Sequence, residues 1–215
     1  MPRGRVLYSL LLVLVSATQV FAWGRGWTRV PTIVLVAPEQ DIRLQVAREA
    51  IDFWNRTFTD LGTPFRLGTV THTTTAIAGD YLEGMSAHVL QRTARPEVPE
   101  SVQKISGDII VVLSEGNFIS FAASLPAEGK VLVGIKSAYR YPLTLSNVAR
   151  NVIAHELGHA LGLGHNDDPT TLMCGRPAPC RPDAFTASTA RFFPLTEADK
   201  ALLLKMYPPN WSGLQ

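Results

Sequence analysis

The sequence has little of several features that mark special classes of protein. It contains only two cysteines in 215 residues, which excludes a disulfide-dense scaffold and a closed zinc site made of thiolates. An excess of one charge is also missing, because the formal net charge is +2 and the charges balance once Arg3 and Arg5 are set aside. A basic surface is therefore not indicated, and we expect no nucleic-acid partner. No apolar run after the first 22 residues is long enough to cross a membrane, so we expect no stable membrane insertion.

The N-terminus has the pattern of a secretory signal. Arg3 and Arg5 precede an apolar run at 6–15, and Val20-Phe21-Ala22 follows with small residues where a signal peptidase cuts. The alternative is an uncleaved anchor, but the run is shorter than the ~20 residues of a spanning helix. We therefore predict a signal peptide at 1–22 and one catalytic domain at 23–215. The working protein is then secreted and extracellular, or periplasmic in a Gram-negative host.

Export would place the two cysteines in a compartment where disulfides form. An oxidising compartment favours a disulfide between Cys174 and Cys180, which would stiffen a short, proline-rich loop. The alternative, a pair of metal-binding thiols, is less favoured because two cysteines alone do not complete a zinc site.

Strand-like and helix-like patterns alternate irregularly along the chain. Short β-branched or apolar runs predict strands at 31–36, 65–70, 109–113, 118–123 and 131–135. Helical spacing of apolar residues predicts helices at 41–58, from a cap at Ser146 onward, and after a capping box formed by Thr196 and Asp199. Residues 71–107 lack a clear period and predict a long loop with short ordered pieces. Strands and helices are partly segregated, so we expect an α+β fold with a mixed sheet.

Two histidines on one predicted helix and a third shortly after it indicate a metal site. His155 and His159 are four residues apart, which places both imidazoles on one helix face. Gly162 can leave helical geometry without a Cβ penalty, so His165 can approach from another direction. Three neutral histidines suit Zn²⁺ and leave a fourth position open, which is typical of one catalytic ion.

Glu156 is the candidate catalytic base beside this metal site. It follows the first predicted ligand, where a carboxylate can take a proton from a zinc-bound water and pass it to a leaving amine. The bland alternative is a set of ordinary polar residues on a helix. Five residues at fixed spacing seldom arise by chance, which favours the metal site.

The stretch His155–His165 resembles the zinc-binding consensus of the metzincins. Their conserved methionine turn is matched by Thr171–Cys174, with Met173 as the methionine. The segments 148–165 and 195–207 are similar to the active-site and closing helices of the matrixins, the matrix metalloproteinase type. The resemblance implies a zincin-like fold with a mixed twisted sheet of about five strands, three helices and a Met-turn after the active-site helix. It also implies supporting roles for Gly162, Met173 and Asp199.

The chain departs from the matrixin pattern in several respects. No cysteine precedes Cys174, so we expect no cysteine-switch restraint, and Gly175 stands where some metzincins carry a tyrosine ligand. His72 and His88 lack the acidic surroundings of a structural zinc site, so we expect no second zinc. Calcium is not indicated either, although Asp167-Asp168 could bind a hard cation. In the resembled family, residues matching 174–193 form the pocket wall beside the cleaved bond.

These patterns together predict a secreted zinc endopeptidase that acts on protein or peptide substrates as a monomer. An extended peptide could pair with an exposed sheet edge, for which 117–123 is the candidate. One alternative is a zinc hydrolase of short peptides or non-protein amides, which the motif does not exclude. A non-catalytic zinc-binding module is the other, and the presence of Glu156 argues against it.

Overall fold

A five-stranded mixed sheet forms the centre of the protein. The computed structural model describes residues 26–127, 129–175 and 180–213, so the expected signal peptide at 1–22 lies outside the described residues. The strands are β1 (Ile33–Val36), β2 (Val70–Thr73), β3 (Ile109–Leu113), β4 (Phe121–Leu125) and β5 (Lys130–Ile135). Their order is β2-β1-β3-β5-β4. The first four strands of that order pair in parallel, and β4 pairs antiparallel with β5 at one edge. The α+β fold with a mixed sheet is therefore confirmed.

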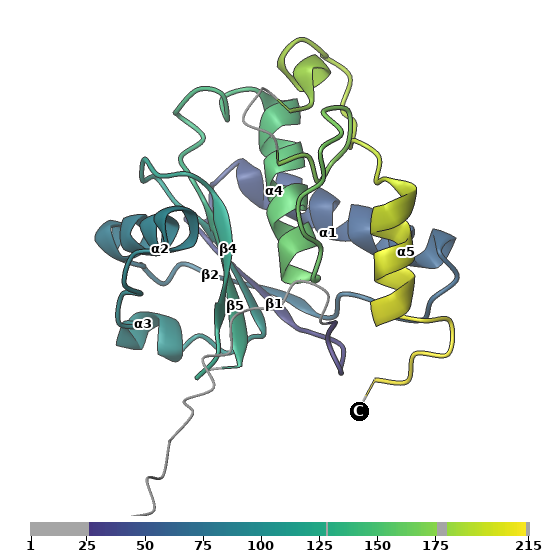
Figure 1. The fold of residues 1–215 in the computed structure, drawn as a ribbon. Coiled ribbons are helices and arrows are strands. Elements are labelled where there is room, and N and C mark those ends of the chain that lie inside the picture. The colour runs from purple at the N-terminus through teal and green to yellow at the C-terminus, as the bar shows by residue number, and fades with distance from the viewer. Residues whose placement is uncertain (1–25, 128, 176–179, 214–215) are drawn as a thin grey trace, which may run out of the picture.

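Helices cover both faces of this sheet. They are α1 (Arg43–Asp60), α2 (Gly79–Gln91), α3 (Glu100–Gln103), α4 (Ser146–Ala160) and α5 (Glu197–Met206), with a 3₁₀ turn at Pro182–Phe185. Figure 1 shows α1, α4 and α5 on one side of the sheet and α2 and α3 on the other. The three expected helices are present as α1, α4 and α5. Among the described residues no helix is both long and apolar enough to cross a membrane.

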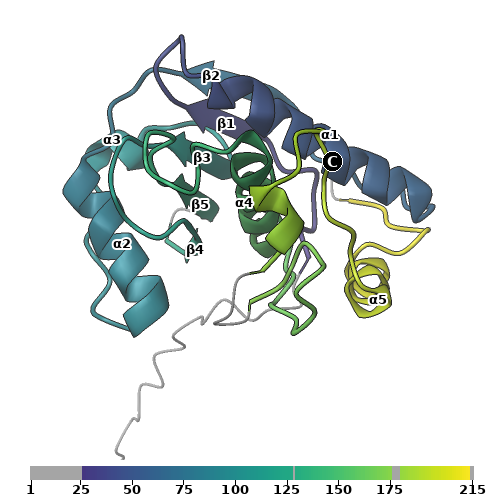
Figure 2. The ribbon, with the colours of Figure 1, turned by 90° about the horizontal axis from the view of Figure 1, so that it is seen from above.

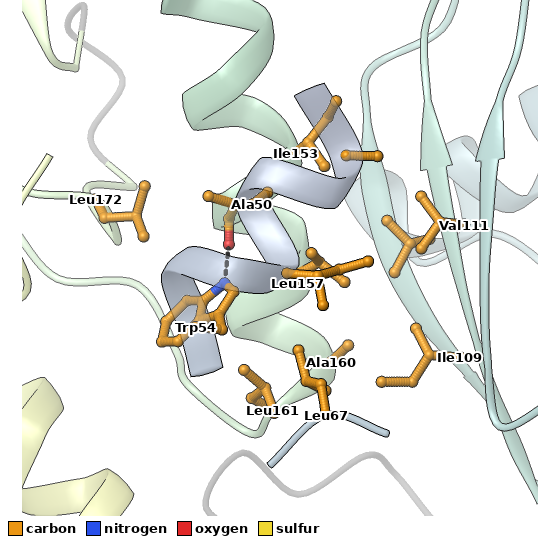
Figure 3. Packing of buried hydrophobic residues seen from close by; sticks show 14 of the residues in the cluster. Ala50, Trp54, Leu67, Ile109, Val111, Ile153, Leu157, Ala160, Leu161 and Leu172 are labelled. Carbon is orange, nitrogen blue, oxygen red and sulfur yellow. Dashed lines mark hydrogen bonds between the residues drawn. The ribbon is translucent and has the colours of Figure 1, made fainter. Parts of the chain in front are cut away.

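The larger core lies between the sheet, α1 and α4 (Figure 3). Trp54 of α1 and Leu157 of α4 are both fully buried there, in one cluster with the β3 residues Ile109 and Val111. The Trp54 indole Nε1 donates a hydrogen bond of 2.9 Å to the carbonyl oxygen of Ala154, which joins the two helices directly. Burial on this scale fixes the position of α4 against the sheet.

The opposite face of the sheet carries a smaller core. Tyr81, Leu82 and Met85 of α2 pack with Ile110 and with the apolar side chains of β4. Figure 2 shows α2 and α3 on this side and α5 at the far end of the molecule, beyond α4. Helix α4 packs into the larger core, whereas the buried apolar residues of α2 belong to the smaller one.

The strand predicted at 65–70 is wrong in its bounds, because β2 begins only at Val70. The Asn55 side chain of α1 holds Leu67 instead: its Oδ1 accepts from the Leu67 amide at 2.8 Å and its Nδ2 donates to the Leu67 carbonyl at 3.3 Å. With both backbone groups of Leu67 occupied, this segment packs under α1 and is unavailable to the sheet.

The loop expected at 71–107 in fact contains α2. Its apolar residues Tyr81, Leu82 and Met85 do follow helical spacing, but Gly79 and Gly84 weaken the pattern and no side chain caps its first turn. Packing against the sheet outweighs this low propensity.

Two further boundaries differ from expectation. Ser146 is the first helical residue and not the cap of α4; the cap position is Leu145, with no side-chain hydrogen bond. The strand expected at 118–123 begins at Phe121, because Ser86 of α2 donates to the Ile119 carbonyl at 2.8 Å and holds the preceding residues in a loop.

Candidate metal centre

Helix α4 places His155 and His159 on one face, one turn apart. Both are buried, with exposed fractions of 7% and 5%. The His155 Nδ1 lies 2.8 Å from the carbonyl oxygen of Leu172, and the His159 Nδ1 lies 2.9 Å from that of Leu163. A carbonyl oxygen only accepts, so each Nδ1 carries the proton and each Nε2 presents a lone pair.

A sharp turn after the helix brings in the third histidine. Gly162 has a φ of +98°, a conformation that residues with a Cβ rarely adopt, and the chain reverses there as expected. The His165 Nε2 then lies 3.2 Å from the His155 Nε2 and 3.0 Å from the His159 Nε2. The three ring nitrogens thus converge on one point from two segments of the chain.

This geometry fits a zinc ion. Zinc–nitrogen bonds of about 2.0–2.1 Å in a tetrahedral arrangement place two ligand nitrogens roughly 3.3 Å apart. The observed separations are close to that value. Lone pairs that face one another repel without a cation between them, so this donor set suits a metal better than it suits three hydrogen-bonding histidines. Among the described residues, His155, His159 and His165 form the group of side chains that could hold a metal.

Burial keeps these histidines neutral, as metal ligands must be. It is the main cause that lowers the pKa of His155 well below its usual range and that of His159 to about 4. The pKa of the more exposed His165 is lowered as well, first by burial and then by the charge of Arg181. Protons therefore compete weakly for these nitrogens near neutral pH.

Glu156 lies between the two helical histidines in sequence and is itself buried, with an exposed fraction of 7%. Burial raises the pKa of its carboxyl to about 8, and the positive charge of Arg181 opposes that rise. A carboxyl whose pKa lies near neutrality is suited to exchange protons. The predicted base is thus a buried carboxyl next to the ligand His155 in the chain.

The turn around Met173 packs against α4, which carries His155 and His159. Met173 is fully buried, and its sulfur lies against Gly158 of α4, where a Cβ would stand only 2.6 Å away. The neighbouring Leu172 carbonyl is the acceptor that orients His155, while the Leu172 amide donates to the Pro194 carbonyl at 2.8 Å. The expected Met-turn therefore packs against α4 and orients one ligand.

Asp199 reaches this turn through Asn166, a residue to which sequence reasoning assigned no role. The Asn166 Nδ2 donates to the Asp199 Oδ2 at 2.9 Å, and its Oδ1 accepts from the Thr171 hydroxyl at 2.9 Å. Asp199 also accepts from Thr196 in the predicted capping box, which is present at the start of α5. A polar chain thus joins α5, the residue after His165 and the Met-turn.

The disulfide Cys174–Cys180 is present, with a Cα–Cα distance of 5.7 Å, and it closes the loop that follows Met173. Gly175 lies inside this loop, at the position where some metzincins carry a tyrosine ligand. A Cβ at Gly175 would stand 2.1 Å from the His165 ring, so only glycine allows the ring and the loop to approach this closely. Residues 176–179 of the expected pocket wall are outside the described residues.

Arg181 is a second residue that no sequence motif indicated. Its Nη1 donates to the Leu172 carbonyl at 2.5 Å, and its charge acts on Glu156, His155 and His165. Its position follows from the disulfide and the fold of the loop, which a linear pattern does not contain.

The remaining histidines make local contacts away from this centre. The His72 Nε2 lies 2.9 Å from the Ala37 carbonyl oxygen, and the His88 Nδ1 lies 2.6 Å from that of Thr93. Asp168 accepts from the amide and hydroxyl of Thr170. These residues are not part of the His155–His159–His165 group.

A comparison with protein families agrees with the motif. A model of the family described as Matrixin matches residues 103–206, which include the three histidines, Glu156 and Met173. Among solved structures, archaemetzincin from Methanopyrus kandleri is similar, with 14% identity, a TM-score of 0.45 and coverage of 81% of this chain and 93% of that one. No curated protein matches the chain. Residues 103–206 are thus similar to the matrixin family of zinc peptidases, as the metzincin-like motif at 155–165 leads us to expect.

Proposed function

We propose that this protein is a secreted endopeptidase that uses one zinc ion, held by His155, His159 and His165, and Glu156 as its base. The observation that carries the proposal is the convergence of three imidazole Nε2 atoms, with that of His165 lying 3.2 Å and 3.0 Å from the other two. The buried carboxyl of Glu156 follows the first of these ligands in the chain. Secretion rests on the signal pattern at 1–22 alone.

Glu156 supplies the proton transfers of peptide hydrolysis. A bound zinc ion would polarise the scissile carbonyl and make water more acidic. Glu156 accepts the proton that the attacking water loses as the new C–O bond forms. It then delivers that proton to the nitrogen as the C–N bond breaks, so the leaving group departs as an amine. The pKa of Glu156, raised to about 8 by burial, favours the second transfer.

His155 and His159 contribute rigidity as well as lone pairs. Their Nδ1–H groups are bonded to the backbone carbonyls of Leu172 and Leu163, which fixes the tautomer and the ring plane of each ligand. A site fixed before substrate arrives keeps its open position aimed at one carbonyl.

The position of β4 supports action on extended peptides. β4 forms an edge of the sheet with β5 as its partner, and α4 packs against both strands. An extended peptide that paired with this edge would run beside the histidine cluster, and its backbone would gain ladder hydrogen bonds independent of sequence. The edge strand covers Phe121–Leu125, two residues beyond the expected 117–123. Recognition along several residues favours cleavage of internal bonds.

A library experiment tests the proposal. Zinc-loaded protein is incubated with blocked peptides of four to twelve residues and with an unfolded whole protein, and products are identified by mass spectrometry. We expect internal cuts, faster for longer peptides, that stop when zinc is chelated. Cleavage of dipeptides or simple amides alone would instead indicate a hydrolase of small substrates. A folded, zinc-loaded protein that cuts none of these would overturn the proposal.

A further inference from the structure

Arg181 extends a positive charge to the edge of the metal centre. It follows Cys180 of the disulfide and has a φ of +53°, and its amide donates to the Pro169 carbonyl at 2.6 Å. Its Nη1 donates to the Leu172 carbonyl at 2.5 Å, the same oxygen that accepts from the His155 Nδ1 at 2.8 Å. One carbonyl oxygen therefore separates the guanidinium from a proposed zinc ligand.

The charge of Arg181 has no carboxylate partner among the described residues. The two most buried arginines differ from it, because Arg43 pairs with Asp41 at 2.6 Å and Arg150 pairs with Glu49 at 2.7 Å. Arg181 is half-buried and bonds only to backbone carbonyls, so within the described part of the chain its Nε and Nη2 donors make no hydrogen bond. Removing a cation from water without a counter-charge is unfavourable. The half-buried guanidinium of Arg181 therefore indicates a functional role in addition to a structural one.

The acid on which the charge of Arg181 acts is Glu156. Glu156 is buried and belongs to the proposed catalytic machinery, and the charge of Arg181 is close enough to oppose the rise of its pKa. The guanidinium is a planar fork of donors that matches a carboxylate in a bidentate way. A substrate carboxylate is therefore the chemical group that would complete the surroundings of Arg181.

We propose that Arg181 is a specificity residue that binds a carboxylate of the substrate close to the bond that is cut. This inference rests on the proposed peptidase function and names its substrate class. The carboxylate has two sources, an aspartate or glutamate side chain or the free C-terminus of a short peptide. A peptide carbonyl at the metal places neighbouring residues only about 3.3 Å apart along the strand, so either source can reach Arg181.

Matched peptide pairs test this proposal. Each pair differs by glutamate or glutamine at one of the three positions on either side of the cut, with both ends blocked. A further pair compares a free C-terminal carboxylate with its amide. The readout is the ratio of kcat/KM within each pair, for the zinc-loaded wild type and for Arg181→Gln, Arg181→Lys and Arg191→Gln. Arg191 is the matched control because it lies ten residues further along the same segment and its charge is already paired with Asp183 at 3.0 Å.

We expect one pair to favour the carboxylate by about 10- to 100-fold in the wild type, as for hydrogen bonds to charged groups. Arg181→Gln should bring that ratio to within about threefold of one. Arg181→Lys should keep part of it and Arg191→Gln all of it. A residue that only holds the Leu172 carbonyl would slow both members of each pair equally and leave the ratio unchanged.

Two outcomes overturn the inference, and both differ from failure of the proposed function. If the wild type cleaves peptides but prefers no carboxylate at any position, Arg181 is not a specificity residue, even if its variants do not fold. If the ratio survives in Arg181→Gln, another group binds the carboxylate. If no peptide is cut, calorimetric binding of the same pairs to zinc-loaded protein decides, because a carboxylate preference lost in Arg181→Gln supports the inference without the peptidase.

Discussion

The two halves of the metal centre are held in place by different forces. The helix half, α4 with His155, Glu156 and His159, is packed into the larger core, and every residue at 153–160 is buried. The loop half, residues 162–175 with Arg181, carries the exposed His165 and is held by directional hydrogen bonds and a disulfide. Burial therefore fixes two ligands and a polar network fixes the third. Substitutions in the two halves should therefore differ in how they change zinc affinity, activity and the free energy of unfolding.

The largest effect is expected at Glu156, where the chemistry of the helix half can be separated from its metal binding. Glu156→Gln keeps the shape of the side chain but removes its basicity, so kcat/KM should fall by about 10² to 10⁴. Zinc content, measured by elemental analysis, should stay the same as in the wild type. Loss of zinc together with activity would mean that Glu156 supports the site structurally.

A core substitution should damage folding and metal binding together if burial holds the helix half. Leu157→Ala leaves a cavity beneath α4, and we expect a loss of about 2–5 kcal/mol in the free energy of unfolding. Denaturant titration measures this loss, and competition with a chelator measures zinc affinity, which should also fall. The matched control is Leu82→Ala in the smaller core, which should lose similar stability while its zinc affinity stays near that of the wild type.

A substitution in the loop half should lower zinc affinity with little change in the free energy of unfolding. Asn166→Ala removes the side-chain bonds to Asp199 and Thr171 beside His165, so zinc affinity should fall by about 10- to 100-fold, the usual cost of losing a partner of the ligand shell. The free energy of unfolding of the zinc-free protein should change far less than in Leu157→Ala. Asn55→Ala, which breaks a similar Asn-to-loop contact at Leu67, is the control and should leave zinc affinity intact. Equal zinc affinities for Asn166→Ala and Asn55→Ala would show that the hydrogen bonds of Asn166 do not hold the third ligand.

An effect of at most about 1.4 kcal/mol for each pH unit is expected from Glu156 and again concerns the helix half. The pKa of Glu156 is about 8 in the folded protein and near 4.5 in the unfolded chain, so between these values the folded state binds the extra proton. In protein kept metal-free by a chelator, the free energy of unfolding should therefore fall as pH rises from about 5 to 8. Glu156 contributes up to about 1.4 kcal/mol of this fall for each pH unit. Glu156→Gln should gain stability relative to the wild type over that range, as measured by denaturant titration.

Glu49 provides a control of the opposite sign. The Arg150 hydrogen bond lowers the pKa of Glu49, so its ionised form contributes stability above about pH 4.5 that is lost as pH falls. Glu49→Gln should therefore be destabilising at pH 7 and less so in acid. If both variants responded to pH in the same direction, the assignment of burial as the cause at Glu156 would be wrong.

The sequence indicated the helix half more completely than the loop half, and the reason is physical. Ligands on one helix recur at fixed spacing, so His155, Glu156 and His159 could be recognised from sequence alone. The strands at Ile109–Leu113 and Lys130–Ile135 were similarly visible, because fully buried strands leave continuous apolar runs. Local periodicity was sufficient wherever one element determined the geometry.

The parts that were missed depend on contacts between distant segments. Arg181 meets the Leu172 carbonyl only because the chain folds back after the disulfide, and Asn166 gains its role from Asp199, 33 residues further along. Gly175 matters because the His165 ring lies against it. Helix α2 was read as a loop since its stability comes from the sheet it covers and not from its own sequence.

The most direct test of the central claim is a titration of zinc into the metal-free protein, with peptide cleavage followed at each step. We predict that activity rises linearly and reaches its plateau at one zinc per chain, and that His159→Ala and His165→Ala show no rise at the same concentrations. Full activity in the absence of zinc, or in either histidine variant, would contradict the account.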